Sequence, residues 1–128
     1  MEITANALQT VAPNAVVVFT STAVNGNSSI LHREGSGLVS LRGLTNQCRA
    51  RFYVSFGANI ALPADGTVGP ISLAIAVNGE PIGTSTMIAT PAAVEEFHNV
   101  SSSLFIDVAQ GCCAQISVEN VTTDDVDV

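Results

Sequence analysis

The chain has 128 residues and a mass of 13.1 kDa, which fits one domain that buries about two thirds of its unfolded surface. Charged residues make up 12% of it, lysine is absent, and the formal net charge is -7. An acidic chain repels phosphate groups, which argues against nucleic acid and anionic membranes as partners. The first ten residues have neither a basic start nor a continuous apolar run, so they indicate neither a signal peptide nor a membrane anchor.

Residues 1–14 are polar and include Pro13, which predicts an N-terminal arm that becomes ordered only when something holds it. A run of β-branched residues predicts the first strand at residues 15–24. Two shorter strands are expected at residues 29–33 and 38–42, where apolar residues are separated by a glycine-rich turn.

The longest expected strand covers residues 48–62, where apolar and polar side chains alternate almost without a break. Its inward set is Ala50, Phe52, Val54, Phe56, Ala58, Ile60 and Leu62. The same period of two returns at residues 71–77, and no part of the chain shows a comparable helical period. The sequence therefore predicts a mostly antiparallel β protein.

The dipeptide Asn78-Gly79 predicts a type I′ hairpin after this strand, because both central residues of that turn need positive φ. Further strands are expected at residues 80–87, 94–100, 104–108 and 112–121. Residues 123–128 carry three aspartates and predict an acidic C-terminal tail.

About eight or nine short strands without a crossover helix favour a sandwich or barrel over residues 15–122. We expect an antiparallel jelly-roll β-sandwich. An immunoglobulin-like sandwich is the less favoured alternative, because the chain has no tryptophan and so lacks the Cys, Trp, Cys spacing of that fold.

Four segments in this order resemble the tumour necrosis factor and complement globular-head superfamily, in the form found in phage structural proteins and in collagen-like bacterial surface proteins. They are residues 30–35, the long strand with Tyr53, LAIAVNGEPIG from Leu73, and NVSSSLFIDVAQGCCAQISVENVT from Asn99. The resemblance implies a compact jelly roll that assembles as a homotrimer. The sequence departs from the superfamily in having no collagen-like Gly-x-y repeat and only six aromatic residues, Tyr53 and five phenylalanines.

The small residues Ser72, Ala74 and Ala76 share one face of the strand at residues 71–77. Small side chains suit close packing against a second sheet or a neighbouring subunit, so this face is the candidate trimer face. An ordinary half-exposed strand remains the alternative.

Arg49, Arg51 and Tyr53 share the polar face of the long strand. Such a row suits an acidic glycan, a carboxylate of a partner or a neighbouring subunit, and it is the candidate contact row. The alternative is that the arginines pair with carboxylates of the same chain or trimer.

Three cysteines, Cys48, Cys112 and Cys113, are an odd number, which indicates reduced thiols rather than a disulfide framework. Cys112 continues the inward set of its strand and is expected to be buried, whereas Cys113 is expected to point outward or into an oligomer contact. No further cysteine or histidine stands at ligand spacing, so we expect no metal and no cofactor.

No catalytic pattern accompanies the strands. Gly35, Ser36 and Gly37 lack the Gly-x-Ser-x-Gly elbow, and the neighbours Glu95 and Glu96 would face opposite sides of a strand. The sequence therefore predicts a protein that is not an enzyme.

Two function classes follow. The first is a viral structural protein, a trimeric phage capsid decoration or head-fibre protein that is assembled in the host cytoplasm and binds the major capsid protein or another virion protein. Ile3, Leu8 and Val11 of the arm are then the candidate capsid anchor, since they offer apolar area. The alternative is a carbohydrate- or receptor-binding module of a phage, or of a bacterial cell or spore surface.

Overall fold

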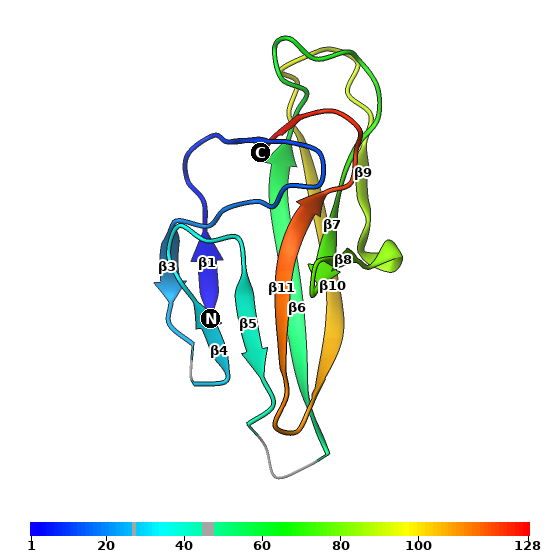
Figure 1. The fold of residues 1–128 in the computed structure, drawn as a ribbon. Helices are drawn as coiled ribbons and strands as arrows, with labels where there is room; N and C mark the ends of the chain where they lie inside the picture. Colours follow the sequence, from blue (N-terminus) through cyan, green and yellow to red (C-terminus); the bar gives the residue numbers. More distant parts are fainter. Residues whose placement is uncertain (27, 45–47) are drawn as a thin grey trace.

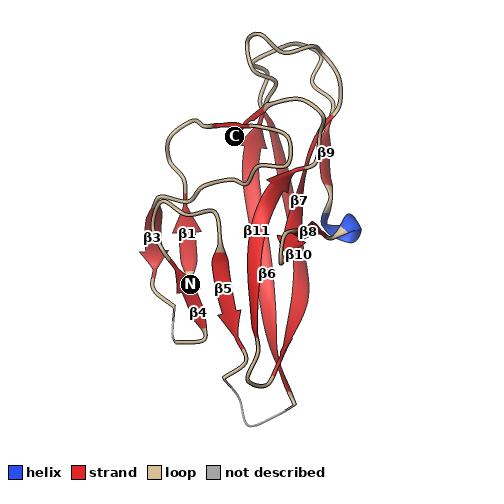
Figure 2. Ribbon diagram, in the orientation of Figure 1, coloured by secondary structure: helices blue, strands red, loops and turns tan. Residues whose placement is uncertain are grey.

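A computed structural model of the chain describes residues 1–26, 28–44 and 48–128. Within these ranges the chain forms twelve β-strands, one short 3-10 helix at Gly83–Ser85 and no α-helix (Figure 1, Figure 2). All strand pairs are antiparallel, so the prediction of an all-β antiparallel chain is confirmed. The described ranges contain no helix with the length and apolar character needed to cross a membrane.

The first layer is a six-stranded sheet in the order β4-β5-β11-β7-β8, with β9 paired to another part of β7. Its strands are β4 (Ile30–His32), β5 (Val39–Arg42), β7 (Ile71–Val77), β8 (Glu80–Pro81), β9 (Met87–Ala89) and β11 (Cys113–Asn120). Central strand β7 has the predicted bounds. The turn after it has φ values of 52° at Asn78 and 84° at Gly79, which confirms the expected positive φ at both residues.

The second layer is a two-stranded ribbon of β6 (Arg49–Ile60) and β10 (His98–Ala109), which pair along their whole lengths. In Figure 1 the ribbon runs behind β11 and β7 of the first layer. Val54 and Phe56 of β6 belong to the same apolar cluster as Leu73 and Ile75 of β7, so the core lies between the two layers. The chain is therefore a β-sandwich.

Some predicted strands have different bounds in the structure. The expected break within residues 98–109 is absent, because its serines pair in the ladder, where Ser102 lies opposite Phe56. The expected strand at residues 80–87 is interrupted after β8 by the 3-10 helix, and β9 begins only at Met87. There the hydroxyl of Ser85 accepts a bond of 2.9 Å from the backbone N–H of Ile75 in place of a strand.

Both termini are built into the fold, which corrects the expectation of a free arm and a free tail. Strand β1 (Glu2–Thr4) pairs with β3 (Ser21–Val24), and β2 (Thr10–Val11) pairs with β12 (Val126–Asp127). The side chains of Val11 and Val126 are buried in the main core. Burial of these two valines stabilises the ordered positions of both segments. The mostly polar composition of the segments did not indicate this burial.

Asn120 joins the two terminal segments. Its side chain is fully buried, and its Nδ2 donates to the carbonyl oxygens of Val11 at 2.9 Å and of Asp124 at 2.8 Å. Its Oδ1 accepts a bond of 2.9 Å from the backbone N–H of Thr122. A buried amide that forms all these bonds fixes the positions of the segments that it contacts.

Candidate functional site: the outer face of the ribbon

The candidate site is the solvent side of the β6–β10 ribbon, called the outer face below. It consists of six cross-strand pairs: Arg49–Ala109, Arg51–Asp107, Tyr53–Phe105, Ser55–Ser103, Gly57–Ser101 and Asn59–Asn99. All twelve residues are exposed, while the residues between them point toward the core. The two-residue period of a strand produces this division.

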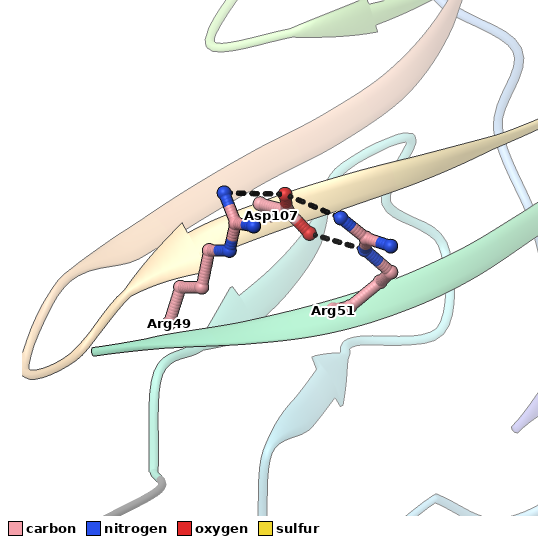
Figure 3. A network of polar contacts seen from close by, with 3 residues as sticks. All are labelled: Arg49, Arg51 and Asp107. Carbon is pink, nitrogen blue, oxygen red and sulfur yellow. Dashed lines mark hydrogen bonds and ion pairs between the residues drawn. The ribbon is translucent and has the colours of Figure 1, made fainter. Parts of the chain in front are cut away.

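Asp107 of β10 sits between the two arginines of β6 (Figure 3). The Arg51 guanidinium donates to both carboxylate oxygens, from Nε at 2.9 Å and from Nη2 at 3.2 Å, and Arg49 Nη1 lies 3.4 Å from the same carboxylate. These contacts confirm the alternative that the arginines pair within the chain. The row carries two positive charges against one negative charge, so it keeps a net positive charge on an acidic protein.

The ion pair changes the pKa of both partners. The hydrogen bond from Arg51 holds the pKa of the Asp107 carboxyl below its ordinary value, helped by the positive charges of Arg51 and Arg49 and opposed by desolvation. The same hydrogen bond and the charge of Asp107 raise the pKa of Arg51. The carboxylate is therefore ionised at neutral pH and stays paired with the arginines.

An aromatic pair continues the row. The rings of Tyr53 and Phe105 lie 5.3 Å apart at an interplanar angle of 55°, and their exposed fractions are 64% and 65%. The Arg51 guanidinium lies 5.8 Å from the centre of the Phe105 ring. Two large aromatic side chains exposed beside a charged network form an apolar patch with a polar rim, the composition that is typical of binding surfaces.

Two residues of this site, Phe105 and Asp107, were missed by the sequence reasoning. Ile106 and Val108 point inward, so the period of two within residues 104–108 places Phe105 and Asp107 on the outer face. What the sequence does not contain is the register that sets them opposite Tyr53 and Arg51.

The predicted trimer face is corrected. Ala74 and Ala76 are fully buried within the chain, because β7 is covered on both sides. Ser72 is half-buried, and its backbone N–H donates to the hydroxyl of Thr122 at 2.8 Å. Ala74 and Ala76 therefore cannot contact another subunit in this fold.

The three residues of the predicted capsid anchor have separate environments. Val11 is buried in the main core, and Ile3 packs against the smaller apolar cluster. Leu8 is 66% exposed. Of the three, Leu8 alone retains a large apolar surface for an outside partner, so the anchor is wrong for Val11.

All three cysteines are free and exposed. The expected burial of Cys112 is wrong, because its N–H donates to the carbonyl of Ala109 in the turn before β11, which begins at Cys113. The exposure of Cys113 is confirmed. Among the residues that the structure describes, no group of three or more His, Cys, Asp or Glu side chains is placed to hold a metal ion.

Comparison with known protein families finds no family model that matches the chain, and comparison with curated proteins finds no match.

Proposed function

We propose that the chain is a structural protein of a virus particle, a phage capsid decoration or head-fibre protein, and that it docks through the outer face. The observation that carries the proposal is the exposed pair Tyr53 and Phe105 beside the Arg51–Asp107 ion pair. Aromatic residues and arginine are the side chains that most often dominate protein–protein binding energy. A surface otherwise rich in Ser, Thr and Asn suits a protein that is held among other particle proteins.

The proposal includes a jelly-roll topology and a homotrimer. The two-layer sandwich and the order of its segments support the first. The second rests on the resemblance of the sequence to a trimeric superfamily, and its contact surface must be one other than Ala74 and Ala76, which are buried within the chain. Multi-angle light scattering is expected to give about three times the 13.1 kDa chain mass at micromolar concentration, and a monomer mass would contradict the trimer.

Docking is tested with the double variant Tyr53→Ser, Phe105→Ser and the control double variant Ser55→Ala, Ser103→Ala on the same face. Gold-labelled protein is imaged on purified particles that lack their own copy. We expect the aromatic variant to lose at least about tenfold in occupancy, because truncation of central aromatic residues costs more than about 1.4 kcal/mol of binding energy. The control is expected to bind like the unchanged chain. Equal binding of both variants would contradict docking through the aromatic pair.

A carbohydrate-binding surface module is the second candidate, and the same aromatic pair favours it. An aromatic side chain offers an apolar plane to a sugar ring, and Arg49 lies at the end of the same row with a guanidinium suited to a carboxylate. Titration with sialylated and neutral oligosaccharides distinguishes the candidates. Saturable binding of the sialylated sugar that Arg49→Gln weakens would favour this function over docking on a particle.

A further inference from the structure

The sandwich has an opening on one side of the ribbon. A cavity of about 530 Å³ lies between the N-terminal segment and β6, with Val39 of β5 and Ile116 and Val118 of β11 among its lining residues. Cavities of this size are in the range that takes up ligands. It lies beside the ribbon, and of the aromatic pair on the outer face Tyr53 is among its lining residues whereas Phe105 is not.

Two strand edges border this cavity. Residues 1–6 and residues 52–59 line it without a gap in either sequence. A strand that turns a face to a cavity contributes every second residue, whereas a strand that turns its edge contributes successive residues. β1 and β6 therefore present their backbone edges to it.

Both edges are unused by the described part of the chain. β6 pairs with β10 along one edge, and no described strand pairs with its other edge over Arg49–Ile60. β1 pairs with β3 alone among the described strands. Each edge therefore offers a row of backbone N–H and C=O groups, which is the template for an added strand.

The inner side chains next to the β6 edge are also incompletely covered. Phe52, Val54, Phe56 and Ala58 point toward the core but are only half-buried, whereas Leu73 and Ile75 of the opposite sheet are fully buried. An added strand with alternating apolar side chains would cover this area and would bond to both edges.

We propose that this cavity accepts an extended polypeptide segment of a partner protein as an added strand between β1 and β6. A polypeptide is the occupant because it carries donors and acceptors on both edges at the spacing of a strand, which a lipid or a sugar does not. The inference goes beyond the proposed function and holds for any partner that supplies such a segment.

A different protein is the source, not a second copy. Each of the twelve strands in the described ranges is already paired, so a second copy would have to give up a pair in order to donate one. Glu2 is the charged side chain among the described residues that line the cavity, so a segment with alternating apolar residues and no acidic residue fits.

The test uses a synthetic peptide of alternating threonine and valine with a lysine at each end, about nine residues long, which is the length of an ordinary strand. In the free protein, amides of β6 that face the cavity are expected to exchange with deuterium quickly, and those bonded to β10 slowly. Peptide binding is expected to slow exchange on β1 and on the cavity side of β6. A matched peptide with methylated backbone nitrogens is expected not to bind.

Two variants on one strand locate the site. Ala58 and Ala50 are both half-buried alanines that point inward from β6, but of the two only Ala58 lines the cavity. Ala58→Leu is expected to weaken peptide binding at least about tenfold by filling the space, and Ala50→Leu to leave it unchanged. Circular dichroism checks that both variants fold.

Three results would overturn the proposal. Absence of binding at millimolar peptide would show that the edges do not accept a strand. Equal binding of the methylated peptide would show that the cavity takes apolar side chains without backbone pairing. Protection of the cavity-side amides in the free protein that rises with protein concentration, and that Ala58→Leu abolishes, would assign the cavity to a second copy.

Discussion

Strands β7 and β6 both turn apolar side chains to the core, but they differ in how completely the chain covers them. β7 has paired neighbours on both edges and is covered on both faces, so every residue from Leu73 to Ala76 is buried. β6 has one paired neighbour, one face in water and an inner face that is only half-buried. A fully covered strand such as β7 stabilises the fold. A partly covered strand such as β6 keeps a face and an edge that a partner can contact.

The same difference explains which sequence patterns were interpreted correctly. Strict alternation in β6 indicates one solvent-exposed face and one face toward the core, and β6 has these two faces in the structure. In β7 large apolar residues alternate with the small residues Ser72, Ala74 and Ala76, so the strand has no charged face, as is typical of a strand buried on both sides. Ala74 and Ala76 are small because a second surface of the same chain covers them, not because another subunit does.

The largest expected effect contrasts the two strands directly. Ile75→Asp places an unpaired carboxylate in the core, where the side chain is 1% exposed, and should cost at least about 4 kcal/mol and unfold the chain. Ser55→Asp on the outer face of β6 is expected to leave the fold intact. Thermal denaturation by circular dichroism measures both. Cooperative melting of the Ile75 variant would place β7 outside the core.

A smaller effect is expected at Asn120, which joins the two terminal segments through its side-chain hydrogen bonds. Asn120→Ala leaves the carbonyls of Val11 and Asp124 and the N–H of Thr122 without this partner, which should cost about 2 to 4 kcal/mol. Urea denaturation gives the free energy of unfolding. The control is Asn59→Ala on the outer face, where the side chain bond to Asn99 is exposed.

An equal loss of stability in the two asparagine variants would contradict the role assigned to Asn120. Limited proteolysis gives a second readout. The Asn120 variant should be cut sooner within residues 5–15 than the unchanged chain, because release of Val11 frees the segment around β2.

How much of the architecture the sequence predicts depends on the range of the interactions involved. The alternation in residues 48–62 and the Asn78-Gly79 turn are local signals, and both are found in the structure. The pairing of β2 with β12 joins residues more than a hundred positions apart, and no local pattern encodes it. For the same reason only part of the outer face was predicted. The alternation within β6 is enough to place Arg51 there, but the register between β6 and β10 sets Asp107 opposite it.

The smallest expected effect concerns this pair of strands and depends on pH. The pKa of Asp107 is lowered in the folded chain, chiefly by the hydrogen bond from Arg51, so the folded state binds its proton less readily than the unfolded state. The stabilisation is therefore fully present above the unfolded pKa and is lost as the pH falls through the folded pKa, below about pH 4.

Asp107→Asn removes this stabilisation, so its melting temperature should lie below that of the unchanged chain at pH 7 and converge with it as the pH falls below about 4. The difference should be smaller than for the Asn120 variant and should decrease with added salt, because the pair is exposed to solvent. Asp65→Asn is the control, since Asp65 is exposed in a loop and forms no ion pair with a described residue. Scanning calorimetry from pH 2 to pH 7 measures all three proteins. A difference for Asp107→Asn that persists at the lowest pH would show that the carboxylate stabilises β6 and β10 by packing rather than by its charge.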